Sequence, residues 1–189
     1  MTTPEAAKAP DTRLDKHVLL VAGVVVLGSI MSILDVTVVA VAQDTFQTVF
    51  HTNQAGAAWS MTAYTLALAT VIPLTGWAAD RFGTKRLYML ALVLFTLGST
   101  LCAMADSIEL LIAFRALQGL AGGSMIPLVF TTAFAFFQGK QRVIAAATIG
   151  GLASLAPTLG PTVGGWITEN FSWHWLFFIN VVPGIYIAV

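Results

Sequence analysis

Long apolar runs separated by short polar stretches dominate the hydrophobic pattern of this chain. Five runs are long enough to cross about 30 Å of hydrocarbon as helices that rise about 1.5 Å per residue. They lie near residues 18–42, 55–79, 87–105, 108–136 and 143–167, and a sixth run covers residues 175–189. Because about 20 apolar residues are needed to span a bilayer, the sixth helix is predicted to be truncated. The pattern predicts a polar tail over residues 1–17 and an all-α transmembrane domain over residues 18–189.

The composition indicates an integral membrane protein. Hydrophobic residues make up 57% of the sequence and charged residues 10%, and the mean hydropathy is +0.83. In soluble domains, by contrast, about a quarter of the residues are charged. The formal net charge is zero, so the position of each charge is more informative than the sum. The one cysteine, Cys102, lies within an apolar run, which excludes an intrachain disulfide.

The positive charges are distributed unevenly along the chain. Short loops rich in Lys and Arg stay on the cytoplasmic side of a membrane. If the N-terminal tail is cytoplasmic and the helices alternate, every Lys and Arg except Arg115 falls on that side. These residues are Lys8, Arg13, Lys16, Arg81, Lys85, Arg86, Lys140 and Arg142. We therefore predict a multi-pass protein of the plasma (inner) membrane, surrounded by lipid bilayer, with its N-terminus in the cytoplasm.

A charged segment joins the second and third predicted helices. Its notable residues are Gly76, Asp80, Arg81, Gly83, Lys85 and Arg86. Gly83 allows a sharp reversal of the chain without a side-chain penalty. Asp80 is expected to accept hydrogen bonds from the free amides at the start of the third helix. Alternatively, Asp80 and Arg81 belong to a charge lock on the cytoplasmic face, with Arg142 as a further member, that opens during the transport cycle.

Two charged residues lie inside predicted helices, Asp35 in the first and Arg115 in the fourth. Each lies about seven residues, or roughly 10 Å, from the outer end of its helix, so the two share one polar layer. Tyr64 and Gln118 reach a similar depth and are candidates for lining a substrate cavity. Charges inside a membrane are costly, and they mark a transport pathway, a proton relay or a paired structural site.

Two interpretations of this pair remain open. A static salt bridge would hold the helices together, although burying both charges costs desolvation energy. Alternatively, Asp35 gains and loses a proton, because a change in its distance from Arg115 changes which protonation state is favoured. The second interpretation predicts a proton-coupling site at Asp35 and Arg115.

Small residues and prolines cluster in the fifth predicted helix. The residues concerned are Ala156, Pro157, Gly160, Pro161, Gly164 and Gly165. Small residues at positions 156, 160 and 164 form a smooth ridge that lets another helix approach closely, and the two prolines bend the same face. The cluster predicts a hinge or gasket, and ordinary small-residue packing is the alternative.

Several functional classes find no support in the sequence. His17, His51 and His174 are scattered over a tail and loops, without the spacing of metal ligands. The sequence has no GxSxG, HExxH or GxxxxGK[ST] motif, so we predict neither an enzyme nor a nucleotide hydrolase. Basic patches interleaved with aromatic residues are absent as well, so no nucleic-acid partner is expected.

Together the motifs resemble those of the major facilitator superfamily, and within it the fourteen-helix drug:proton antiporters, over residues 34–183. Residues 76–86 are similar to the loop signature GxLaDrxGrkxxl, with Ala78 and Thr84 as departures. Residues 111–119, LIAFRALQG, resemble the fourth-helix motif, with Arg115 at the position implicated in proton transfer.

Three further segments carry the same resemblance. Residues 160–165 are similar to the end of the antiporter motif. Residues 34–42 resemble the first-helix segment LDxTVVNVALP, with Ala40 where the family has Asn. Residues 173–184 resemble the segment WRWxFxINxP, with His174 where the family has Arg.

The resemblance implies a fold of two six-helix halves around a central cavity, of which residues 18–189 would form the N-terminal half. It also implies export of small amphipathic drugs or toxic compounds in exchange for protons, with residues 76–86 as a gating loop. The proton gradient would supply the energy without a cofactor, and a C-terminal half would be required for transport. A metabolite transporter of the same fold and a non-transporting membrane assembly subunit are the alternatives.

Overall fold

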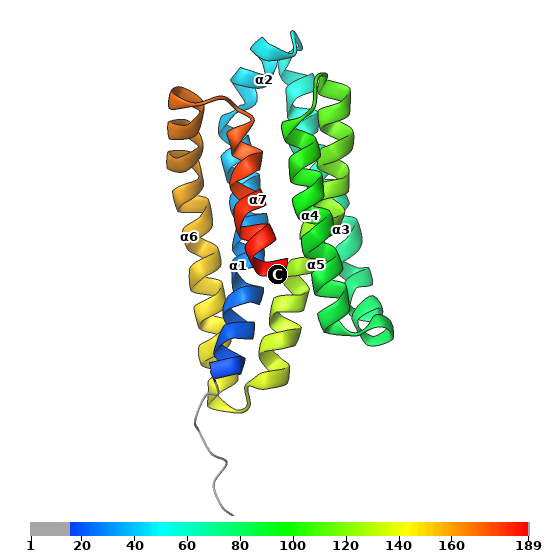
Figure 1. The fold of residues 1–189 in the computed structure, drawn as a ribbon, viewed down its shortest axis with the longest axis vertical. Helices are drawn as coiled ribbons and strands as arrows, with labels where there is room; N and C mark the ends of the chain where they lie inside the picture. The colour runs from blue at the N-terminus through cyan, green and yellow to red at the C-terminus, as the bar shows by residue number, and fades with distance from the viewer. Residues whose placement is uncertain (1–15, 189) are drawn as a thin grey trace, which may run out of the picture.

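The computed structural model describes residues 16–188 of the protein, which fold into seven α-helices (Figure 1). They are α1 (Lys16–Val41), α2 (Gln43–Val49), α3 (Gln54–Phe82), α4 (Thr84–Ala103), α5 (Ile108–Phe136), α6 (Lys140–Asn170) and α7 (Trp175–Ala188). The polar tail predicted over residues 1–17 lies outside the described residues, except for its last two, with which α1 begins.

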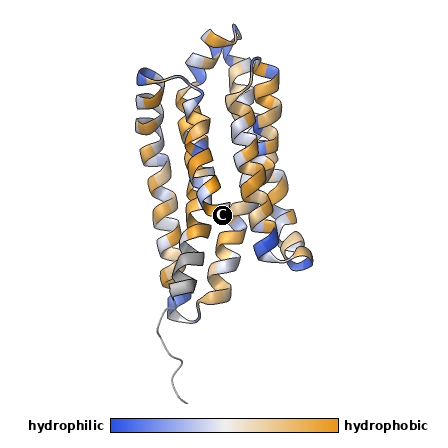
Figure 2. Ribbon diagram, in the orientation of Figure 1, coloured by the Kyte–Doolittle hydropathy of each residue, from blue (hydrophilic) through white to orange (hydrophobic). Residues whose placement is uncertain are grey.

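All the helices except the short α2 run alongside one another (Figure 1). In this view α6 forms one edge of the bundle and α3 lies toward the other. The central helix is α5, which packs against α3, α4 and α1, while α1 also packs against α6. Hydrophobic residues cover most of the helix lengths, and many of the hydrophilic ones gather near the helix ends (Figure 2).

Five helices are long and apolar enough to cross a membrane, namely α1, α3, α4, α5 and α6. The apolar helix α7 has 14 residues. At about 1.5 Å per residue, it is shorter than the hydrocarbon layer is thick. The structure thus confirms the predicted all-α membrane fold.

The charged segment over residues 76–86 is more helical than predicted. Helix α3 continues to Phe82 and α4 starts at Thr84, so only Gly83 interrupts the two helices. Gly83 has a φ of +87°, a left-handed conformation that a residue with a side chain rarely adopts. One glycine is therefore enough to reverse the chain, and the charged residues lie in the last turn of α3 and the first turn of α4.

The predicted loop between the first two spanning helices contains the short helix α2. Its Phe46 side chain is fully buried. The Phe46 ring packs edge-on against the Trp173 ring, at 5.7 Å between centroids, and is tilted against the Phe50 ring, at 6.1 Å. This aromatic cluster fixes α2 over one end of the bundle. The expected loop is ordered here because it has an apolar side chain to bury.

Close contact between α3 and α5 depends on glycines of α5. A Cβ atom placed on Gly123 would lie 2.7 Å from the carbonyl oxygen of Leu68, and one on Gly119 would collide with the Tyr64 carbonyl. Helices in membranes commonly associate through such small residues, which allow the backbones to approach. The glycines thus bring α3 within reach of the polar side chains of α5.

We predict that Gly123→Ala destabilises the bundle, because the added methyl group meets backbone atoms that cannot move aside. Overpacking of this kind costs about 1–3 kcal/mol. Thermal unfolding of the purified chain in detergent measures the effect. Gly151→Ala is the matched control, since Gly151 is also within a helix but has open space beside it. A Gly123→Ala variant that melts at or above the temperature of the Gly151→Ala variant would contradict the prediction.

Candidate functional site

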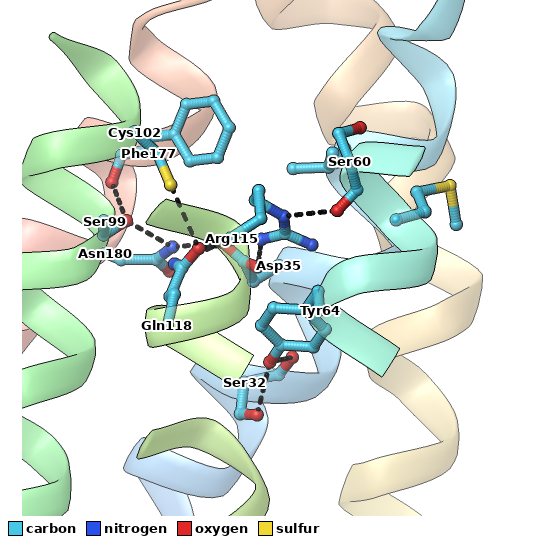
Figure 3. Close-up of polar contacts among 12 residues, drawn as sticks. Ser32, Asp35, Ser60, Tyr64, Ser99, Cys102, Arg115, Gln118, Phe177 and Asn180 are labelled. Atoms are coloured by element: carbon cyan, nitrogen blue, oxygen red, sulfur yellow. Dashed lines mark hydrogen bonds and ion pairs between the residues drawn. The ribbon is translucent and has the colours of Figure 1, made fainter. Parts of the chain in front are cut away.

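The centre of the bundle contains an ion pair between Arg115 of α5 and Asp35 of α1 (Figure 3). Both side chains have 0% exposure. Among the side chains that the structure describes, those of residues 23–139 and 141–187, this is the one salt bridge. The structure therefore brings together the two charges that the sequence placed inside helices.

Three donors surround the Asp35 carboxyl group. Its Oδ2 accepts a hydrogen bond from Nη1 of Arg115. Its Oδ1 accepts from Nε2 of Gln118 at 3.0 Å and from Nδ2 of Asn180 at 2.7 Å. This arrangement suits a carboxylate, which only accepts hydrogen bonds, and it presents no acceptor to the proton of a carboxylic acid.

Besides Asp35, groups of α5 and α3 hold the Arg115 guanidinium. Its Nη1 also donates to Oε1 of Gln118 at 2.8 Å, and its Nε donates to the carbonyl oxygen of Ser60 at 3.4 Å. The Cζ atom lies 4.0 Å from the centroid of the Tyr64 ring, within the range of a cation–π interaction. Among the described atoms, Nη2 has no hydrogen-bond partner, so one NH₂ group of the guanidinium is still an unused donor.

Tyr64 ties α3 to α1 one turn before Asp35. Its hydroxyl donates to the Ser32 carbonyl oxygen at 3.1 Å and shares a hydrogen bond of 2.9 Å with the Ser32 hydroxyl. Gly122 leaves room for this contact, since a Cβ there would lie 2.6 Å from the Ser32 hydroxyl oxygen. Tyr64 therefore has two roles in the site, as an aromatic surface for Arg115 and as a link between helices.

Tyr64 and Gln118, which the sequence predicts to line a substrate cavity, are fully buried. They do not line the apolar cavity of about 540 Å³ that opens between α1, α5 and α6. Most of its lining is aliphatic or aromatic, and it includes Val25, Val129, Phe136 and Ile149. Whether Tyr64 or Gln118 contacts a substrate therefore stays a prediction.

Two functional candidates in the polar cluster were not nominated from the sequence. Asn180 of α7 contacts Asp35, and Ser99 of α4 contacts Asn180 (Figure 3). An amide within the apolar run over residues 175–189 is a usable signal, because polar groups inside a membrane need partners. Ser99 gives no such signal, since serine hydroxyls in helices commonly bond to their own backbone.

The small-residue ridge of α6 packs against α1 close to Asp35. A Cβ on Gly160 would collide with the Thr37 side chain, and one on Gly164 would lie 2.9 Å from the Val38 carbonyl oxygen. Pro157 and Pro161 lie on the exposed side, Gly165 is half-buried, and α6 continues through both prolines without a break. The ridge is thus a helix contact in this structure, and its role as a hinge or gasket stays a prediction.

Most of the predicted gating residues lie at the surface. Gly76 is within α3, and Asp80, Arg81, Lys85 and Arg86 are exposed. The expected cap by Asp80 is wrong, because Asp80 lies in the last turns of α3 and no side chain caps α4.

The suggested lock with Arg142 is not formed either. Arg142 donates to the carbonyl oxygens of Phe134 at 2.6 Å and Phe137 at 2.8 Å. These carbonyls lie at the end of α5, where free acceptors attract a cation. Arg142 therefore stabilises a helix terminus in this structure.

Comparison with known proteins gives consistent matches. The family model described as Major Facilitator Superfamily matches residues 25–189. A "Multidrug resistance protein B homolog" of Mycobacterium tuberculosis is 49% identical over 176 residues, which cover 93% of this chain and 32% of the relative. The "Colistin resistance protein EmrB" of Acinetobacter baumannii is 37% identical over 163 residues, which cover 86% of this chain and 32% of the relative.

Solved structures show the same fold. The proton:xylose symporter XylE has a TM-score of 0.78 at 15% identity, with 90% of this chain and 43% of that chain covered. A bacterial homolog of the human lysosomal transporter Spinster, in an inward-facing and unoccupied conformation, has a TM-score of 0.72 at 20% identity. That match covers 93% of this chain and 42% of the other. The chain spans about a third of the length of the curated relatives it matches.

We predict that the ion pair stabilises the bundle only as a pair. Asp35→Leu leaves a buried cation without a partner, and Arg115→Met leaves a buried anion, each at a cost of about 3–5 kcal/mol. The double variant removes both charges and is expected to be more stable than either single variant. Thermal unfolding of the three variants in detergent measures this coupling, and strictly additive losses would contradict it.

Proposed function

This chain belongs to the Major Facilitator Superfamily, and we propose that it forms the N-terminal half of a proton-coupled exporter of amphipathic drugs or toxic compounds. The single observation that carries the proposal is the fully buried ion pair of Asp35 and Arg115 in the middle of the bundle. A charge pair that never changed would cost desolvation without contributing to transport.

The proposed mechanism uses Asp35 as the proton carrier and Arg115 as its electrostatic partner. With Arg115, Gln118 and Asn180 donating, the carboxylate is stabilised as an anion. If these donors move away while water reaches the site, the anion loses its partners and a proton from that water binds in their place. Rocking of the two halves around a midplane site would open it to each side of the membrane in turn.

The proposed substrate class is supported by the cavity and by the relatives. The apolar cavity between α1, α5 and α6 offers few polar groups, which favours apolar ligand surface over specific hydrogen bonding. The curated relatives include proteins named for multidrug and colistin resistance. These observations support an amphipathic compound that places its apolar part against the cavity wall.

The direction of transport rests on the proposed orientation. Lys85 and Arg86 at the start of α4 and Arg142 near the start of α6 would lie at the cytoplasmic surface of the plasma (inner) membrane. The N-terminus would lie on the same side. Protons entering the cell would then drive the substrate outward, with the lipid bilayer and a C-terminal half as the required partners.

We predict that this chain supports proton-driven export when a C-terminal half is supplied. Residues 25–189 can replace the matching segment of the Mycobacterium tuberculosis relative, which is 49% identical. Inside-out vesicles with an acidic lumen should take up a fluorescent amphipathic dye, and a protonophore should abolish the uptake. Asp35→Asn should reduce the uptake to the level of empty vesicles, because a side-chain amide does not ionise near neutral pH and cannot act as a proton carrier.

Asp44→Asn is the matched control, since Asp44 is an exposed carboxylate of α2 and should not affect uptake. Gradient-driven uptake that survives Asp35→Asn would contradict the proposed role of Asp35. Vesicles that take up a metabolite but not the dye would favour the metabolite transporter. A complete lack of flux, with specific binding of a membrane partner, would favour the assembly subunit.

A further inference from the structure

A chain of buried hydrogen bonds connects Asp35 to the backbone of α7 (Figure 3). Nδ2 of Asn180 donates to Oδ1 of Asp35 at 2.7 Å and to Oγ of Ser99 at 3.1 Å. The Ser99 hydroxyl in turn donates to the carbonyl oxygen of Phe177 at 2.8 Å. These bonds join α1, α4 and α7 through side chains that are at most 3% exposed.

Protonation of Asp35 would conflict with this arrangement. A carboxylic acid has an O–H group that needs an acceptor, whereas Arg115, Gln118 and Asn180 all present donors to it. A side-chain amide can present its oxygen in place of its nitrogen by turning through about 180°. The conflict can therefore be relieved by a turning amide, without moving any charge.

Of the two amides, Asn180 is the one that is free to turn. Gln118 uses both ends of its amide, since Oε1 accepts from Nη1 of Arg115 and Nε2 donates to Asp35. Turning Gln118 would place its NH₂ group against the Arg115 cation. Asn180 makes no hydrogen bond to Arg115 in the described part of the chain, so it meets no such opposition.

We propose that Asn180 and Ser99 form a relay that transmits the protonation of Asp35 to α7. When a proton from water binds Asp35, the Asn180 amide turns and its oxygen accepts the new O–H. The same oxygen then faces the Ser99 hydroxyl, which turns toward it and away from the Phe177 carbonyl. Release of the proton to water restores the first arrangement. The relay depends on the proposed function in that Asp35 must bind and release a proton.

The consequence is a weaker contact between α4 and α7 while the proton is bound. Besides the two hydrogen bonds of Ser99, to Phe177 and from Asn180, this contact includes the close approach of Gly184 to Thr96, where a Cβ would collide with the threonine side chain. The hydroxyl of Thr96 bonds to its own helix and adds no link to α7. Loss of the bond from Ser99 to Phe177 is therefore expected to loosen α7.

Other groups near Asp35 do not offer this route. The titratable groups that face it are Arg115 of α5, Tyr64 of α3 and Cys102 of α4. The described hydrogen bonds connect none of them to Asn180 or Ser99. The α6 surface near Asp35 presents Gly160 and Gly164, which carry no titratable side chain.

The relay is tested by measuring hydrogen exchange of α7 at constant pH, with the chain reconstituted in lipid nanodiscs. Asp35→Asn mimics the neutral carboxyl group and should speed exchange of the peptide over residues 177–187 on the order of fivefold, as expected for one lost hydrogen bond. In Ser99→Ala exchange should already be fast, because the bond to Phe177 is absent, whereas in Asn180→Leu the Ser99 hydroxyl keeps that bond. In both backgrounds, adding Asp35→Asn should cause no further change in α7 relative to α6 of the same sample. A merely structural Ser99 or Asn180 would leave the response to Asp35→Asn intact.

Ser124→Ala is the matched control. Ser124 is a buried serine of α5 whose hydroxyl bonds only to the Leu120 carbonyl of its own helix. The Asp35→Asn response should persist in this background. A full response in Ser99→Ala or Asn180→Leu, or an absent response in the otherwise unchanged chain, would overturn the relay.

A second measurement covers the case in which Asp35→Asn fails to fold. The exchange rate of α7 is divided by that of α6 in the same sample, once at neutral pH and once at acidic pH. In the unchanged chain this ratio should rise on acidification. The ratio should not rise in Ser99→Ala, and a rise of equal size would overturn the relay. If transport in vesicles stays coupled to protons while exchange of α7 does not respond to pH or to Asp35→Asn, the relay fails and the proposed function stands. Transport that is not coupled to protons would contradict the proposed function itself.

Discussion

Burial of one ion pair in an apolar bundle constrains most of this structure. Taking Asp35 and Arg115 out of water is costly, and their attraction offsets the cost only when their remaining hydrogen-bonding groups are also satisfied. Those partners come from α3, α5 and α7, with Ser99 of α4 behind Asn180. Five helices must therefore meet at one depth, which requires the close packing that Gly119 and Gly122 permit.

Helix α6 is related to the pair in a different way. It donates no hydrogen bond to either charge in the described chain, and it contacts α1 through Gly160 and Gly164 at Thr37 and Val38. The segment of α1 that carries Asp35 is thus held by polar contacts on one side and by backbone packing on the other. A smooth contact without directional bonds can slide at lower cost than the polar network, so movement of α1 is better accommodated along α6.

Sequence reasoning succeeded where the membrane limits the possible arrangements. Helices of fixed rise between two surfaces set a depth for each residue, so Asp35 and Arg115 could be placed at one level from their spacing alone. The same reasoning failed for Ser99, because Ser124 and Ser29 have similar surroundings in the sequence and yet bond within their own helices. Which hydroxyl reaches across depends on helix rotation and packing. The charged residues around Gly83 misled for another reason: they suggested a loop, but charged side chains are compatible with exposed helical turns, and α3 continues to Phe82 while α4 begins at Thr84.

The chemistry around Asp35 explains why neutral groups are suited to sensing its charge. A second titrating side chain would add another buried charge, with its own desolvation cost, each time the site changed state. A side-chain amide and a hydroxyl can each switch from donating to accepting a hydrogen bond by rotation, and both stay uncharged. Asn180 and Ser99 can therefore change partners inside hydrocarbon at the cost of hydrogen-bond geometry alone. The change reaches a backbone carbonyl of α7, and a helix responds to the loss of one anchor as a unit. A single proton is in this way able to alter a helix contact without any further charge entering the bundle.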